Sequence, residues 1–147
     1  MTNKKVLYFD DERFISNALA ENLELFGWNV TLVSTAEELF GELSDQYDIL
    51  IIDIMAPVPD QKNESIEFTK GDIQQMDQGC NTGIVFATKI WEINNQEFAD
   101  LPILFLSARK PPESIITFMN EGRKCDCLCK PQLTQAIDEN LKRLLNN

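Results

Sequence analysis

Short runs of apolar residues alternate along this chain with segments in which apolar residues recur at helical spacing. Residues 49–52 form the clearest run, because every position is apolar instead of every second one. A strand of that kind has both faces buried, which is typical of a parallel sheet covered by helices on each side. The alternation therefore predicts a doubly wound α/β fold around one parallel sheet.

Five strands and five helices are expected in the order of a (βα)₅ chain. The apolar runs predict strands at residues 6–9, 28–33, 49–52, 101–106 and 125–129. Helical spacing predicts helices at residues 15–26, 34–43, 82–91, 111–121 and 133–144. Gly27 offers a stop for the first helix, and Ser34 followed by Glu37 is a capping-box pattern that would begin the second.

One domain is expected to span residues 1–147, since this length, with 44% hydrophobic residues, supports one core and leaves no room for a second. The regular pattern fails at residues 58–81, which are mostly polar. We expect this segment to be a long inserted loop, with at most a short helical turn. It could be a lid, a docking surface or plain elaboration of a surface loop.

The composition excludes several classes of function. Thirteen Lys and Arg against twenty-four Asp and Glu give a formal charge of −11, so direct binding of nucleic acid is not expected. No apolar run is long enough for a membrane span, and a cytoplasmic location is expected. The chain has no histidine, which excludes His-based catalytic triads and HExxH zinc sites. The four cysteines are expected to be reduced, with three of them small residues of one strand.

Polar side chains follow the ends of four predicted strands. Because ligands bind beyond the carboxyl ends of parallel strands, these side chains should meet at one edge of the sheet. They are Asp10, Asp11, Asp53, Ser107 and Lys130. Three clustered carboxylates favour a bound cation, and oxygen ligands suit Mg²⁺ or Mn²⁺. A lysine and a hydroxyl beside that ion suit an anion, with a phosphoryl group as the obvious candidate.

Four segments resemble the motifs of the CheY-like receiver domain of response regulators in two-component signalling. In chain order they are VLYFDDE at 6–12, LIIDIMAP at 50–57, PILFLSA at 102–108 and CKP at 129–131. The resemblance covers nearly the whole chain, interrupted by residues 58–81. It implies the flavodoxin-like receiver fold and a role as a phosphorylated switch, not an enzyme, although the domain would assist its own phosphorylation and dephosphorylation.

The resemblance also implies a role for each site residue. Asp53 would accept a phosphoryl group from a phosphohistidine of a sensor histidine kinase or a histidine phosphotransfer protein. Mg²⁺ would be held by Asp10, Asp11, Asp53 and the backbone carbonyl of Met55. The phosphoryl oxygens would be contacted by Lys130, Ser107 and the backbone amide of Ala108. A downstream target protein would then recognise the changed surface.

Three features depart from the pattern of that family. The glycine that usually closes a short loop after the phosphoacceptor corresponds here to Gly83, so the segment 58–81 stands beside the site. Cys127 occupies the position of an aromatic switch residue. Arg109, two residues beyond Ser107, could cover a phosphoryl group or pair with an acid.

Two other functions stay open at this point. One is a receiver-like interaction module that is not phosphorylated. The other is a Mg²⁺-dependent phosphatase of the haloacid dehalogenase type. That family needs an acid two residues after its nucleophile, where this chain has Met55.

Overall fold

The computed structural model describes residues 3–60 and 66–146. Five parallel strands form one sheet in the order β2-β1-β3-β4-β5. The strands are β1 (Lys5–Phe9), β2 (Asn29–Val33), β3 (Ile49–Asp53), β4 (Ile103–Ser107) and β5 (Cys125–Cys129). The predicted doubly wound α/β fold is confirmed, and the strand ends lie within two residues of those predicted.

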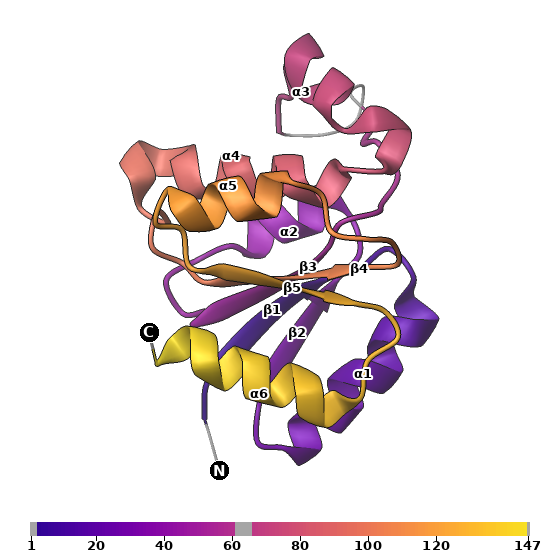
Figure 1. Cartoon of the computed structure of the whole chain (residues 1–147), viewed down its shortest axis with the longest axis vertical. Helices are drawn as coiled ribbons and strands as arrows, with labels where there is room; N and C mark the ends of the chain where they lie inside the picture. Colours follow the sequence, from indigo (N-terminus) through magenta and orange to yellow (C-terminus); the bar gives the residue numbers. More distant parts are fainter. Residues whose placement is uncertain (1–2, 61–65, 147) are drawn as a thin grey trace.

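Helices cover both faces of the sheet (Figure 1). On one face lie α1 (Arg13–Leu25) and α6 (Thr134–Leu145). On the other lie α2 (Ala36–Glu42), α4 (Thr82–Gln96) and α5 (Ser114–Asn120). Gly27, with φ of 97°, follows α1 in the left-handed conformation that favours glycine, so the predicted stop of this helix is confirmed.

The two faces of the sheet belong to two separate hydrophobic clusters. Tyr8 and Ile51 pack in the cluster that includes residues of α1 and α6. Phe9 and Ile52, one position further along the same strands, pack in the larger cluster with α2, α4 and α5. Successive strand residues point to opposite faces, so both faces must be apolar for strands buried this way. The uninterrupted apolar runs in the sequence have this cause.

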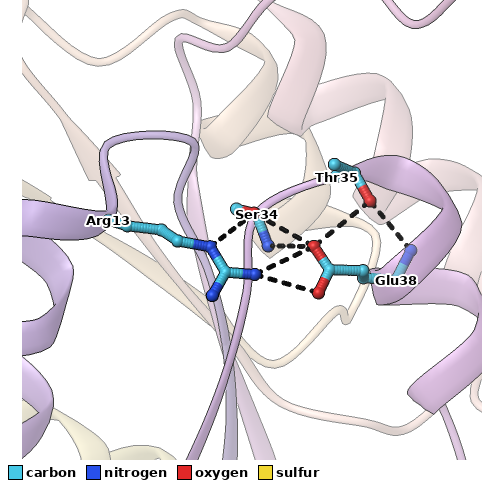
Figure 2. Close-up of polar contacts among 4 residues, drawn as sticks. All are labelled: Arg13, Ser34, Thr35 and Glu38. Atoms are coloured by element: carbon cyan, nitrogen blue, oxygen red, sulfur yellow. Dashed lines mark hydrogen bonds and ion pairs between the residues drawn. The ribbon is translucent and has the colours of Figure 1, made fainter.

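The start of α2 differs by one residue from the predicted capping box. Thr35, not Ser34, is the N-cap, and its hydroxyl accepts a hydrogen bond from the Glu38 amide at 3.1 Å. The Glu38 carboxylate accepts from the Ser34 amide at 3.2 Å and pairs with Arg13 at 3.0 Å (Figure 2). Burial opposes ionisation of Glu38, but the hydrogen bonds from Ser34 and Arg13 outweigh it and lower its pKa. Glu37, the predicted partner, has no part in this cap.

The described part of the segment 58–81 has more secondary structure than the predicted loop. It contains α3 (Lys70–Gln75), which begins at a full capping box of Thr69 and Asp72, and the 3₁₀ helix η1 (Asp77–Gly79). The described residues therefore hold six α-helices, and the prediction of five was wrong by one. In Figure 1, α3 lies beyond α4, on the side away from the sheet. Residues 61–65 of the predicted loop lie outside the described residues.

The described part of this inserted segment (residues 58–81) packs against the rest of the domain. Met76 is fully buried and Phe68 nearly so, both in the larger cluster. The Phe68 ring stacks on Phe86 at a centroid distance of 5.6 Å. Lys89 of α4 lies 5.2 Å from the centre of the Phe68 ring and 3.6 Å from the Asp72 carboxylate. Two further apolar residues of the segment, Ile66 and Ile73, are partly buried against the same cluster.

Four cysteines and two tryptophans complete the description of the fold. All four cysteines are free thiols. Cys125 and Cys127 pack in the larger cluster, as expected for small core residues on one face of β5. Cys129 was expected there too, but it is exposed, because it lies at the end of the strand. Trp28 and Trp91 are buried packing residues. Within residues 3–60 and 66–146, no helix combines the length and the apolar character needed to cross a membrane.

Candidate functional site

Three carboxylates meet at the carboxyl edge of the sheet. Asp53 is the last residue of β3, and Asp10 directly follows β1, the neighbouring strand. The pairing of Phe9 with Ile52 places Asp10 beside Asp53. One oxygen from each of Asp10, Asp11 and Asp53 lies within 4.8 Å of the others. Of the described residues, these form the single group of three acids or cysteines so arranged.

Lys130 bridges two of these acids. Its Nζ lies 3.0 Å from Asp10 Oδ2 and 3.3 Å from Asp53 Oδ2. The position follows from the sheet, because the Lys130 amide donates to the Ser107 carbonyl at 2.7 Å and so extends the pairing of β5 with β4. The side chain thus reaches back across the end of β4 toward β3. One ammonium faces two buried carboxylates, which leaves the site rich in negative charge.

The excess of negative charge shifts the pKa values. Burial, followed by the charge of Asp10, raises the pKa of Asp53 to about 7, although Lys130 works in the opposite direction. Burial disfavours the charged form of Lys130, but the attraction of Asp53 and Asp10 outweighs it and raises the pKa of the ammonium. The ionised form of Asp53 is therefore electrostatically disfavoured, and an added cation would stabilise it.

Asp10 is held in place by one partner on β1 and one just before α1. Tyr8 donates its phenolic hydroxyl to Asp10 Oδ2 at 3.1 Å, and the Glu12 amide donates to Oδ1 at 2.9 Å. Burial and the nearby Asp10 charge raise the pKa of Tyr8 far above its usual value, so the phenol stays a donor. Tyr8 was not identified from the sequence. Its position two residues before Asp10 places both on one face of β1, and this spacing was the available signal.

Asp11 offers the oxygen that most directly indicates a cation. Its Oδ1 is buried and has no hydrogen-bond partner among the described residues. Burial, with the neighbouring Asp10 and Glu12 charges, raises the pKa of Asp11, although a backbone hydrogen bond lowers it. Asp11 and Met55 line the same cavity of about 410 Å³. An all-oxygen set with one unsatisfied carboxylate oxygen fits Mg²⁺ or Mn²⁺.

Ser107 and Ala108 lie on two sides of the site. The Ser107 hydroxyl accepts a hydrogen bond from the Arg109 amide at 3.1 Å. Ser107, Arg109 and Met55 line a cavity of about 210 Å³. Ala108 lines a different cavity of about 380 Å³, together with Lys130. The structure thus places both residues next to other predicted site residues, while their contacts with a phosphoryl group stay a prediction.

Cys127 lies on β5, opposite Phe105 of β4. Burial, followed by the charges of Cys129 and Asp126, raises the pKa of the Cys127 thiol to about 12, so it packs as a small neutral side chain. A compact thiol cannot make the large rotation that an aromatic switch residue makes. The departure that the sequence showed at this position is thus a small packed thiol in place of a mobile ring.

Comparisons with known proteins give the fold. No family model matches the chain. The transcriptional regulatory protein CpxR of Escherichia coli K12 is 38% identical over 53 residues, which are 36% of this chain and 23% of that protein. CpxR of Klebsiella pneumoniae is 36% identical over the same length. The match thus spans about a quarter of the length of these relatives.

Solved structures agree over the whole chain. A CheY-like receiver domain protein from Methanospirillum hungatei has a TM-score of 0.69 at 17% identity, with 99% of this chain and 95% of that chain covered. A two-component response regulator from Clostridium difficile gives 0.68 at 20%, covering 99% and 98%. The receiver domain of the Francisella response regulator 1452 gives 0.65 at 24%, covering 98% of each. The chain therefore has the fold of the CheY-like receiver domains of response regulators.

Proposed function

We propose that the whole chain acts as one receiver domain that accepts a phosphoryl group on Asp53 with the help of a divalent cation. The observation that carries this proposal is the cluster of Asp10, Asp11 and Asp53 with Lys130 bridging two of its members. A buried, partly unpaired acid cluster lowers stability, so its presence indicates a functional site. Binding of a cation and a phosphoryl group would give every residue of the cluster a role.

Asp53 is the nucleophile in this proposal. Its carboxylate oxygen attacks the phosphorus of a phosphohistidine, so that an O–P bond forms while the P–N bond breaks and the imidazole leaves with the electron pair. Lys130 lies 3.3 Å from the attacking carboxylate and would pair with the phosphoryl oxygens. Ser107 and the Ala108 amide are the proposed donors to the remaining oxygens.

The cation would be held by Asp10, Asp11, Asp53 and the carbonyl of Met55. When bound, Mg²⁺ or Mn²⁺ supplies positive charge that stabilises the phosphoryl oxygens during transfer. The chain's own part is to hold the carboxylates in place. Tyr8 and the Glu12 amide fix Asp10, and burial at the end of β3 fixes Asp53.

The proposed partners follow from this chemistry. The phosphoryl donor would be a histidine kinase or a histidine phosphotransfer protein. The absence of histidine from this chain is compatible with that, because the donor histidine belongs to the partner. The product would change contacts with a downstream target protein. CpxR is named a transcriptional regulatory protein, but the match covers only 23% of its length. We therefore do not propose that this chain binds nucleic acid directly.

The proposal is tested by incubating the protein with acetyl phosphate and Mg²⁺ and measuring its intact mass. The wild type should gain one phosphoryl group, which acid hydroxylamine treatment removes, and Asp53→Asn should gain none. Asp45→Asn, an exposed acid that precedes β3 and so lies away from the end of this strand that carries Asp53, is the matched control and should react like the wild type.

Two outcomes would contradict the proposal. An adduct that persists in Asp53→Asn would place the phosphoryl group elsewhere, and no adduct at all would favour an interaction module that is not phosphorylated. Sustained turnover of p-nitrophenyl phosphate would instead favour a phosphatase of the haloacid dehalogenase type.

A further inference from the structure

The backbone around Met55 is fixed on both sides of its carbonyl. On the N-terminal side, the Ile54 amide donates to the Leu106 carbonyl at 2.9 Å, and the Ile54 carbonyl accepts from Gly83 at 2.8 Å. On the C-terminal side, the Ala56 amide donates to the Gly79 carbonyl at 3.1 Å. The Ala56 carbonyl accepts from the Thr82 hydroxyl at 2.7 Å. Every polar backbone group of the two neighbours of Met55 is therefore bonded.

The Met55 carbonyl itself has no such partner. No described residue donates a backbone hydrogen bond to it. The residue lines the 410 Å³ cavity with Asp11 and the 210 Å³ cavity with Ser107. A carbonyl held between two bonded neighbours is pre-organised, because little freedom remains to be lost when it binds a ligand.

Most of these bonds come from the end of the inserted segment and the start of α4. Gly83 approaches β3 so closely that a Cβ there would lie 2.8 Å from the Ile54 Cα and nearer still to the Asp53 carbonyl. Gly79 is similarly close, since a Cβ there would lie 2.8 Å from the Ala56 carbonyl. Both glycines allow the backbone contacts, but neither contributes a side chain.

Thr82 is the one side chain in this arrangement. It is 0% exposed, and its hydroxyl donates to a buried carbonyl 26 residues earlier in the chain. Thr82 is the first residue of α4, and the helix does not need this side-chain bond in order to form. The bond instead fixes the loop that contains Ala56. A buried carbonyl without this donor would be left unpaired or would move toward another partner.

We propose that Thr82 is a positioning residue for the cation site, because it fixes the Ala56 peptide and thereby the Met55 carbonyl beside Asp11 and Asp53. This inference rests on the proposed function, and it assigns to the start of α4, directly after the inserted segment, a part in building the site. Thr82 does not touch the cation; it acts through the backbone of residues 54–56.

The test measures cation binding without any phosphoryl transfer. The concentration of free Mn²⁺ is measured by electron paramagnetic resonance while the unphosphorylated protein is titrated with Mn²⁺. Thr82→Val, which keeps the shape and removes the hydroxyl, should weaken Mn²⁺ binding by about tenfold, as expected for one buried hydrogen bond. Thr82→Ser, which keeps the hydroxyl, should stay within about twofold of the wild type.

Thr88→Val is the matched control on the same helix. Its hydroxyl donates to the Ile84 carbonyl of α4 at 3.1 Å, so its loss removes a similar bond with no link to Met55. Its Mn²⁺ affinity should be unchanged. A second readout is the rate of labelling by acetyl phosphate. At saturating Mg²⁺ the Thr82→Val rate should approach that of the wild type, because positioning affects cation affinity and not the nucleophile.

The outcomes separate this inference from the proposed function. If the wild type binds no Mn²⁺, the proposed function fails. If the wild type binds Mn²⁺ and folded Thr82→Val binds it equally well, or if Thr88→Val weakens binding as much, the role of Thr82 is overturned. Should Thr82→Val not fold, Thr82→Ala is titrated instead, and the same tenfold loss against Thr82→Ser is required.

Discussion

The acid cluster and the end of the inserted segment line the same cavity but affect the stability of the fold in opposite directions. The cluster buries polar groups that oppose one another, with Asp53 and Asp10 sharing a single lysine. The inserted segment looks polar in sequence but buries Met76 and Phe68 in the larger core. The first arrangement costs folding free energy, and the second supplies it.

This contrast separates side chains that stabilise the fold from side chains that serve the chemistry of the site. Removing a side chain that is present for packing should lower stability and leave the site chemistry alone. Removing one that is present for chemistry should have the reverse effect. Each prediction below tests this contrast.

The largest effect is expected in the inserted segment. Met76→Ala should lower the free energy of unfolding by about 3 kcal/mol, because it removes a fully buried side chain and leaves a cavity. Urea denaturation measures the change. Met119→Ala is the matched control, since Met119 on α5 is 50% exposed, and its effect should stay below about 1 kcal/mol. Equal effects for the two variants would mean that the segment is not part of the core.

Because Phe68 and Met76 belong to the core, deleting the inserted segment is a poor test of whether it acts on the site. Deleting residues 60–80 would remove Phe68 and Met76 together and uncover Phe86 beneath them. Any change in phosphoryl lifetime could then reflect a damaged core. Point substitutions on the exposed side of α3 are the sharper test of whether this segment tunes lifetime or partner choice.

The second effect has the opposite sign and depends on pH. The pKa of Asp53 is raised to about 7 from an ordinary value of 3.8. Between these values the folded chain holds a proton that the unfolded chain has lost, so the stability of the wild type falls as pH rises through this window. Asn cannot ionise and escapes this loss. Without divalent cations, Asp53→Asn should therefore be more stable than the wild type by about 2 kcal/mol at pH 8, and nearly equal to it at pH 4.

Urea denaturation at the two pH values, with EDTA present, measures this difference. Asp45→Asn is the control and should match the wild type within about 0.5 kcal/mol at both pH values. Added Mg²⁺ should raise the stability of the wild type more than that of Asp53→Asn. A stability gain for Asp53→Asn that is equal at pH 4 and pH 8 would contradict the assigned pKa.

The sequence could predict the sheet and the acids because both follow from short, local rules. An apolar run such as residues 49–52 indicates a strand buried on both faces, and the residue after the run, Asp53, must then lie at the sheet edge. The fold of residues 66–81 could not be predicted, because Phe68 and Met76 are buried by contacts with distant residues and show no period of their own. Tyr8 and Thr82 were missed for a related reason, since each acts through one hydrogen bond whose partner is only known from the fold.

A smaller effect is expected where the inserted segment meets α4. Lys89→Met should lower stability by about 1 kcal/mol, because it removes the ion pair with Asp72 and the ammonium over the Phe68 ring while keeping an apolar stem. Thermal unfolding in low and high salt measures the change. The difference from the wild type should shrink in high salt, which screens the ion pair. A difference independent of salt would mean that packing alone holds the two parts together.

The smallest effect is expected at the partly exposed network of Arg13 and Glu38 (Figure 2). Glu38→Gln keeps the shape of the cap but removes the charge that faces Arg13 at 3.0 Å, and should cost about 0.5 kcal/mol because both side chains are partly solvated. The pKa of Glu38 is lowered, so its contribution is present at neutral pH and is lost as pH falls through the folded pKa. Wild type and variant should therefore differ in stability at pH 7 and converge in acid.

Thr35→Ala should cost more, about 1 kcal/mol at both pH values, because the hydroxyl that caps α2 does not titrate. If Glu38→Gln proved the more costly of the two, the ion pair between α1 and α2 would matter more than the cap, and the contrast between a costly acid cluster and a nearly neutral surface pair would be weakened.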